Sequence, residues 1–319
     1  MKTKIVYLSI AMFLTGCGGS DSGEPAVVQP PAATTGLFTL GLTDAPVDDA
    51  AKVVVEFDGV ALKRSGADEL EFTFDSRQVD LLSLQNGASE LILEDITVEA
   101  GNYQWIRLMV NAERNTMDSY VELEDTNQIS LFVPSGAQNG LKLNSGFTVL
   151  AGGSVDFTID FDLRKSITDP RGQSDYFLKP SLRVIDNEVS GDVAGTVNET
   201  LVTAEGCSDA SAVYVFDSEV TLDGVDDIDL AEDDQEDIGG PDPISSANVT
   251  LSDENIYEYK AAFLPPGDYI LAFTCHASFD ENDIDNTESE TNMPDFGVSF
   301  TSVAEVTVNA NETTTYNFE

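Results

Sequence analysis

The chain has 319 residues, 41% of them hydrophobic, and its 15 Lys and Arg against 58 Asp and Glu give a formal net charge of −43 at pH 7. Such a charge repels the phosphates of nucleic acids and anionic lipids, which excludes nucleic-acid binding as a function. The single histidine, His276, excludes the usual multi-histidine zinc and copper sites.

Residues 1–16 have the pattern of an export signal that ends at a cysteine. Lys2 and Lys4 precede a short apolar run from Ile5 to Leu14, and small residues then lead to Cys17. The run has about ten residues, against the roughly 20 that a membrane-spanning helix needs. The stretch LTGC resembles the bacterial lipobox, which implies cleavage before Cys17 and attachment of lipid, palmitate included, to that residue.

Residues 17–36 are predicted to be the lipidated cysteine and a flexible tether. Gly, Ser, Pro and Thr dominate this stretch, and it has no apolar periodicity. In bacterial lipoproteins, an aspartate directly after the lipidated cysteine favours retention in the inner membrane, and here that position holds Gly18. The lipoprotein resemblance therefore implies the outer membrane. Whether the protein lies on its periplasmic or its surface face stays open. We expect an exported protein held to a membrane through its N-terminal lipid; an ordinary secretory signal is the alternative.

Residues 37–187 are predicted to form a first β-domain. Apolar and polar residues alternate with period two in many short runs, as in a strand with one buried face. The clearest run is Ser154 to Asp162, in which Val155, Phe157, Ile159 and Phe161 alternate with polar residues. Many short strands separated by turn residues indicate an antiparallel sandwich or barrel.

Residues 188–319 are predicted to form a second β-sandwich with acidic loops. Seven short candidate strands in about 130 residues suit a small sandwich of immunoglobulin or transthyretin type. The boundary lies near Asp186 to Glu188, with almost no linker. The predicted fold class is therefore all-β, with two tandem antiparallel β-sandwich domains. Tyr103 and Tyr269 each follow a turn glycine by two residues, which favours a tyrosine corner over a ligand platform.

Four stretches suggest a family. They are LTDAP from Leu42, GNYQWIRL from Gly101, DFDLRKS from Asp160 and LKP from Leu178. In this order they resemble successive blocks of a bacterial lipoprotein domain, domain of unknown function 4382, over about Gly36 to Asp186. The remainder resembles, more loosely, a carboxypeptidase-regulatory or prealbumin-like β-sandwich. Neither family implies an activity.

Two cysteines remain once Cys17 carries lipid. Cys207 and Cys275 are the one pair available in an oxidising compartment, and we predict a disulfide between them. Two separate buried thiols are the alternative.

Two acidic stretches are candidates for calcium binding. Asp217 to Pro243 holds twelve Asp or Glu in 27 residues, and Ser278 to Asp295 holds seven in 18. Calcium takes six to eight oxygen ligands, but the EF-hand spacing is absent, and solvated acidic loops are the alternative. The candidate ligands are Asp223, Asp226, Asp227, Asp229, Asp280, Asp283 and Asp285.

Two acidic groups of the first domain are weaker candidates. Asp44, Asp48 and Asp49 are close enough in sequence to form a binding site, but an aspartate at the position of Asp44, shortly before Pro46, is also typical of a turn. Asp160 and Asp162 are expected on the outward face of one strand, where Arg164 or Lys165 would pair with them. A structural role is favoured for both groups.

The function indicated is that of a non-catalytic cell-envelope lipoprotein, acting as a binding, adhesion or scaffold module with an unknown protein or glycan partner. The second hypothesis is a carbohydrate-binding accessory lipoprotein, and the third is a hydrolase that uses paired carboxylates. The carbohydrate hypothesis requires an exposed aromatic platform, for which the candidates are Tyr214, Tyr257, Tyr259 and Phe296.

Overall fold

A computed structural model describes residues 34–45, 50–123, 125–134, 140–168, 174–207, 210–222, 224–226, 228, 241–280 and 298–319. Within them the chain from Ala33 to Glu319 is one compact unit. The predicted signal and most of the predicted tether lie outside the described residues, and the first strand already begins at Thr35. In the described part of the chain, no helix is both long and apolar enough to cross a membrane.

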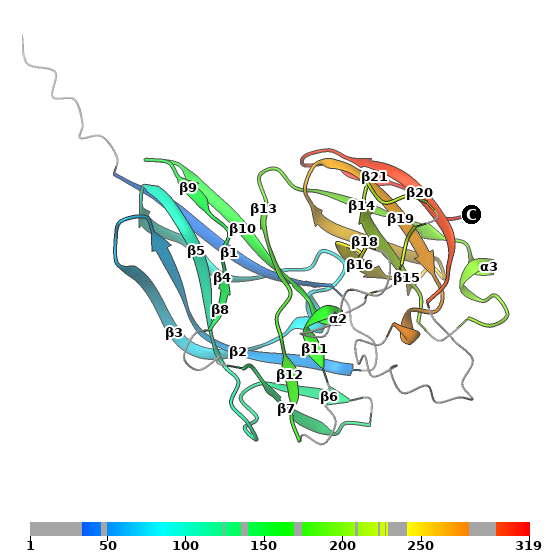
Figure 1. Ribbon diagram of the computed structural model, residues 1–319, viewed down its shortest axis with the longest axis horizontal. Coiled ribbons are helices and arrows are strands. Elements are labelled where there is room, and N and C mark those ends of the chain that lie inside the picture. Colours follow the sequence, from blue (N-terminus) through cyan, green and yellow to red (C-terminus); the bar gives the residue numbers. More distant parts are fainter. Residues whose placement is uncertain are drawn as a thin grey trace, which may run out of the picture. The chain divides into compact units, whose positions relative to one another are not determined.

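The first sandwich has two sheets (Figure 1). One sheet has the order β13-β10-β1-β4, with bounds β1 (Thr35–Ala45), β4 (Glu90–Glu99), β10 (Ser154–Asp162) and β13 (Leu182–Asp186). The other follows the order β11-β12-β7-β6-β2-β5-β8, with β3 beside β2 and β9 beside β5. Its bounds are β2 (Ala50–Arg64), β3 (Glu69–Asp80), β5 (Gly101–Asn111), β6 (Tyr120–Leu123), β7 (Gln128–Phe132), β8 (Leu141–Leu143), β9 (Phe147–Val149), β11 (Ile167–Thr168) and β12 (Tyr176–Leu178).

The core of the first sandwich joins inward side chains of both sheets. Phe38, Leu40 and Leu42 of β1 alternate with polar or glycine residues and belong to the same buried cluster as Val55 and Phe57 of β2. This period-two burial is what the alternating sequence predicts. Two short helical turns, η1 (Leu81–Leu84) and α2 (Leu163–Ser166), connect the sheets.

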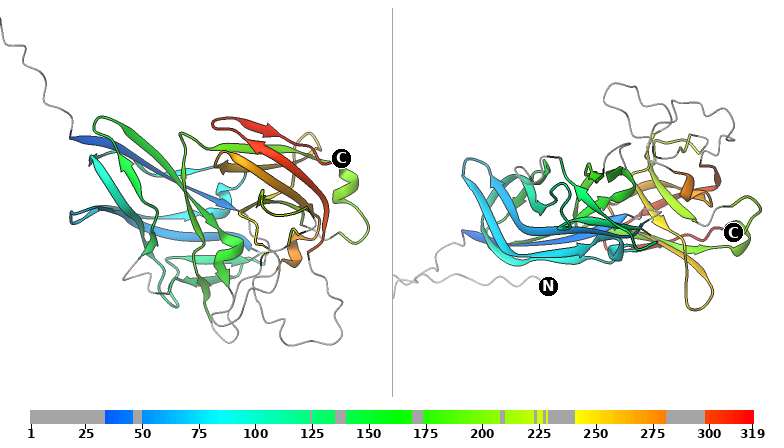
Figure 2. Two further views of the ribbon diagram at one scale, coloured as in Figure 1. Left: turned by 45° about the horizontal axis from the view of Figure 1, so that its top comes forward. Right: turned by 90° about the horizontal axis from the view of Figure 1, so that it is seen from below.

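The second sandwich has two four-stranded sheets (Figures 1 and 2). Their orders are β17-β18-β14-β21 and β16-β15-β19-β20. The bounds are β14 (Gly191–Val197), β15 (Ala212–Asp217), β16 (Ser245–Asn248), β17 (Thr250–Leu251), β18 (Tyr257–Leu264), β19 (Gly267–Thr274), β20 (Phe300–Val308) and β21 (Thr313–Thr315). The helical turns are α3 (Glu199–Val202) and η2 (Ala277–Phe279).

The all-β prediction is confirmed, with one correction to the strand directions. Most pairs are antiparallel, but β1 with β10, β7 with β12 and β14 with β21 are parallel. Parallel and antiparallel strands share the period of two, so the sequence pattern does not distinguish them. The predicted domain boundary near Asp186 falls between β13 and β14.

Both tyrosine corners are present. The Tyr103 hydroxyl donates to the Glu99 carbonyl at 2.8 Å, and the Tyr269 hydroxyl donates to the Pro265 carbonyl at 2.6 Å. Gly101 has a φ of 147°, which a residue with a side chain rarely adopts. Each tyrosine hydroxyl therefore connects the start of its strand to the backbone four residues earlier, once in each sandwich.

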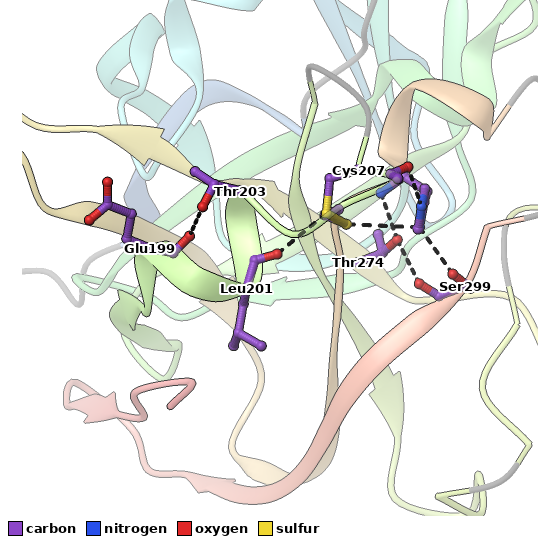
Figure 3. The surroundings of a disulfide bond; sticks show 9 residues. Glu199, Leu201, Thr203, Cys207, Thr274 and Ser299 are labelled. Atoms are coloured by element: carbon purple, nitrogen blue, oxygen red, sulfur yellow. Dashed lines mark hydrogen bonds between the residues drawn. A yellow bond between two sulfur atoms is a disulfide. The ribbon is translucent and has the colours of Figure 1, made fainter.

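The predicted disulfide is also present (Figure 3). Cys207 and Cys275 are bonded, with Cα atoms 5.1 Å apart and a sequence separation of 68 residues. Beside it, the Cys207 sulfur lies 3.4 Å from the Leu201 carbonyl, and Thr274 donates to the Ser299 carbonyl at 2.9 Å. The bond attaches the segment before β15 to the end of β19.

Candidate functional site

A groove of about 730 Å³ lies between β3 and β4 of the first sandwich, and we name it the β3–β4 groove. Its floor consists of apolar side chains that also contact the core. Two come from β3 and three from β4, namely Phe72, Phe74, Ile92, Leu93 and Ile96.

The groove lies where two sheet edges face one another. Among the described strands, β3 pairs only with β2, and β4 pairs only with β1. Each strand therefore presents one row of backbone N–H and C=O groups that no described strand uses. Asp95, at a φ of 49°, lies at an irregularity of β4 and donates its amide to Thr39 Oγ1 at 3.1 Å.

A single arginine connects the two walls of the groove. Arg77 of β3 donates from Nη2 to the Leu91 carbonyl of β4 at 2.6 Å and lies 3.4 Å from a Glu90 carboxylate oxygen. Its guanidinium also lies 5.3 Å from the centroid of the Phe74 ring. The other charged lining residues are the acids Glu71, Asp75 and Glu94, so the rim is mainly negative.

Of the seven predicted calcium ligands, the structure describes Asp226 and Asp280. Asp226 is half-buried, while Asp280 is 8% exposed and accepts hydrogen bonds from the Tyr214 hydroxyl and the Ile228 amide. Arg164 lies 3.9 Å from Asp280, so this carboxylate is used inside the protein. The other five lie outside the described residues: Asp223, Asp227, Asp229, Asp283 and Asp285. Among the described residues, no group of three or more His, Cys, Asp or Glu is arranged to hold a metal ion.

The predicted aromatic platform is not formed by the residues that the structure describes. Tyr214 is 0% and Tyr259 is 3% exposed, and the Tyr259 hydroxyl donates to the Tyr316 carbonyl at 2.9 Å. Burial raises the pKa of Tyr259. Tyr257 is half-buried and packs against the core cluster that contains Tyr259. Phe296 lies outside the described residues.

The expectation that Asp160 and Asp162 lie on an open face is wrong. They are 5% and 9% exposed, because both faces of β10 are covered from Phe157 onward. Asp160 accepts from Arg183 Nε at 3.0 Å, and Asp162 accepts from the Lys165 amide at the start of α2. Burial raises the pKa of Asp162 to about 6, and the charge of Asp160 adds to this rise, while Lys165 and Arg183 offset part of it.

The Arg164 side chain reaches the second sandwich. Only 1% of it is exposed, and it donates from Nη1 to the Ala277 carbonyl of the second sandwich at 2.8 Å. Asp44 is 6% exposed, and Asp48 and Asp49 lie outside the described residues.

Both ring nitrogens of the single histidine, His276, lie close to polar atoms. His276 Nε2 lies 3.0 Å from the Gly206 carbonyl, and Nδ1 lies 3.0 Å from Ser299 Oγ.

A family model matches residues 35–180, and it is described as "Domain of unknown function (DUF4382)". Residues 35–180 are a DUF4382 domain. The match covers β1 to β12 of the first sandwich, so the β3–β4 groove lies inside the DUF4382 domain. No curated protein matches the sequence.

Solved structures align with the chain only loosely. The Bacillus anthracis TIE protein aligns over 90% of this chain at 10% identity and a TM-score of 0.20, and the chain spans 34% of that protein. The minor pilin GBS52 of Streptococcus agalactiae aligns over 88% of this chain and 94% of its own at 10% identity and a TM-score of 0.18. The major pilin subunit of Bacillus cereus aligns over 89% of this chain and 99% of its own at 12% identity and a TM-score of 0.18.

Sequence reasoning found the strands that form this groove but not the groove. Phe72 and Phe74 follow the ordinary period of a strand, and the apolar residues of Leu91 to Val98 also predict a strand, so both runs predict strands of the core and no more.

Proposed function

We propose that the protein is a non-catalytic, lipid-anchored binding module of the cell envelope, whose DUF4382 domain holds an extended peptide segment of another envelope protein in the β3–β4 groove. The proposal rests on one observation: the groove combines an apolar floor with two strand edges whose backbone groups no described strand uses. An added strand gains affinity from main-chain hydrogen bonds and specificity from alternate side chains in pockets.

The chemistry of the groove favours a peptide over a glycan. The five floor side chains carry no polar atom, so they suit apolar side chains, while sugar hydroxyls would lose hydrogen bonds to water there. Glu71, Asp75 and Glu94 on the rim and the net charge of −43 suit Lys or Arg in the partner. We therefore expect a peptide in which apolar and basic residues alternate.

The non-catalytic part of the proposal rests on the roles of the described acids. Asp160 pairs with Arg183, Asp162 caps α2, and Asp280 bonds Tyr214 and Ile228. Carboxylates held in this way are committed to structure rather than to proton transfer.

The groove is tested by selecting peptides of about 12 residues from a random display library on the full chain and measuring binding by fluorescence anisotropy. The rim variant Glu71→Lys/Glu94→Lys is expected to weaken binding about tenfold or more, since it places like charges beside the basic peptide. Phe74→Ala is expected to weaken binding as well, through the lost floor contact.

The matched control reverses two exposed charges elsewhere, Asp253→Lys/Glu254→Lys, and should bind as the wild type does. Equal binding by the rim and control variants would overturn the groove as the site. A glycan that binds on an array and loses binding with Phe74→Ala would replace the peptide by the carbohydrate alternative.

The anchor is a separate part of the proposal and rests on the LTGC stretch. After fractionation of cells, the wild type is expected in the outer-membrane fraction and a Cys17→Ser variant outside it, because three acyl chains hold a protein essentially permanently. Retention of Cys17→Ser in the outer-membrane fraction would contradict lipid anchoring at this residue and leave the groove untouched.

A further inference from the structure

The outer face of the sheet that contains β2, β5 and β8 carries the only tryptophan of the chain, Trp105 of β5. Ile106 and Leu108 of the same strand belong to the core, so Trp105 and Arg107, which alternate with them, lie on the opposite face. Trp105 is partly exposed there. It does not line the β3–β4 groove, so this face is a separate surface of the DUF4382 domain.

Three cations lie around the indole ring of Trp105. Lys63 of β2 is the cross-strand neighbour of Trp105, and Lys142 of β8 is the cross-strand neighbour of Arg107. The Lys142 ammonium lies 4.7 Å and the Arg107 guanidinium carbon 5.4 Å from the centroid of the indole ring. We name these four residues the Trp105 cluster.

Two of these cations have no carboxylate beside them. Arg107 pairs with Glu69 of β3. Among the described lysines and arginines, only Lys63, Lys142 and Lys179 have no carboxylate oxygen within 4.0 Å of a side-chain nitrogen. In a chain with 58 Asp and Glu against 15 Lys and Arg, a basic side chain readily finds a carboxylate nearby. Two unpaired lysines beside one indole therefore indicate an external anion.

The sheet leaves only side chains for a ligand on this face. β2 pairs with β3, β5 and β6, and β5 pairs with β2, β8 and β9, so their backbone groups are used inside the sheet. A peptide cannot be added here as a strand. A pyranose ring fits better, because its flat C–H face can stack on an indole while a carboxylate on its rim pairs with an ammonium group.

We propose that the Trp105 cluster binds a glycan that carries uronic acids, with a pyranose ring on the indole of Trp105 and carboxylates at Lys63 and Lys142. Lys142 is exposed, and an exposed cation–π contact is weak, so its ammonium can leave the ring when the sugar stacks. The net charge of −43 opposes a polyanion, but physiological salt screens exposed charges beyond about 8 Å, so the nearby cations decide the binding.

The test titrates the full chain with tetrasaccharides of galacturonate, glucuronate and mannuronate, and measures tryptophan fluorescence and the heat of binding. Because Trp105 is the only tryptophan, a change in fluorescence reports this site. The wild type is expected to show saturable binding to at least one of these uronates. The methyl ester of that tetrasaccharide keeps the rings without the charges, and should bind about tenfold more weakly.

The variants separate the charge from the ring. Lys63→Gln/Lys142→Gln is expected to weaken uronate binding about tenfold or more. Lys179→Gln is the matched control, since Lys179 is also exposed and also lacks a carboxylate within 4.0 Å, and it should bind as the wild type does. Trp105→Ala is expected to lose binding of uronate and methyl ester alike, measured by heat. The lysine variant keeps the test valid should Trp105→Ala fail to fold.

Three results would overturn the proposal. They are the absence of saturable binding to all three uronates, equal uronate binding by the wild type and Lys63→Gln/Lys142→Gln, and equal binding of a tetra-aspartate peptide, which would replace the glycan by an acidic peptide. Phe74→Ala in the β3–β4 groove should bind uronate as the wild type does, so this proposal and the peptide groove fail independently. The rim variant of the groove does not serve here, because Glu71 lies 3.6 Å from Arg107.

Discussion

Asp175 is a buried carboxylate that holds three segments of the DUF4382 domain together. It is 2% exposed and accepts hydrogen bonds from the Ser130 hydroxyl and from the Asn115 amide at 2.9 Å. Arg114 lies 3.5 Å away and also covers the ring of Phe132 at 4.4 Å. The Ser130 hydrogen bond is the main cause that lowers the pKa of Asp175, and the Asn115 and Arg114 contacts add to it.

We predict that Asp175→Asn lowers the free energy of unfolding by about 1 to 2 kcal/mol at pH 7, because the hydrogen bonds lose their charged acceptor. A carboxyl with a lowered pKa stabilises the fold at pH values above its unfolded pKa, near 3.8, and this contribution is lost as the pH falls below that value. Urea unfolding from pH 7 to pH 3 measures it. The two proteins should converge at low pH, and a difference that grows with acid would contradict the assignment.

At the scale of elements, the alternation of apolar and polar residues was sufficient to predict strands but not what covers them. The Ser154 to Asp162 run forms β10 as predicted, yet both faces of its second half are buried. The same holds for β15 and β19, whose outer faces form a second small core that contains Tyr214 and Phe216. A period of two describes one buried face, and burial of the other depends on packing between elements distant in sequence.

The candidate sites could not be predicted for the same physical reason. Tyr214 has a large ring on a short strand, as a ligand platform requires, but the outer face of its sheet is covered. The β3–β4 groove depends on two strands remaining unpaired at their outer edges, which is a property of sheet order. The disulfide was predictable because only two cysteines were available to pair.

At the scale of the whole molecule, Arg164 connects the two sandwiches. From α2 it reaches the Ala277 carbonyl, lies 3.9 Å from Asp280 and covers the Tyr214 ring at 5.7 Å. Arg164 and Asp280 have side chains that are 1% exposed, so loss of one charge leaves the other in a buried environment. Nearby, Lys165 donates to the Pro243 carbonyl at 2.6 Å and reinforces the same contact.

We predict that Arg164→Met destabilises the protein by about 3 kcal/mol, since it removes one partner of a buried charge pair. By scanning calorimetry, the wild type should unfold in one transition and the variant in two, because the sandwiches lose their main coupling. Arg64→Met is the control: its partner Glu99 is largely exposed, so its effect should stay below about 1 kcal/mol. A single, unshifted transition in Arg164→Met would refute the role of Arg164.

The place of β1 inside its sheet has a consequence for how the chain folds. The first strand pairs with β4 on one edge and, in parallel, with β10 on the other, so Leu37 lies opposite both Thr97 and Ser154. A chain that emerges N-terminus first therefore exposes Phe38, Leu40 and Leu42 until β10 has followed. Contacts this distant in sequence make folding slow, in the range of milliseconds to seconds. The emerging chain thus spends that time as an aggregation-prone strand, which a holding chaperone would have to protect.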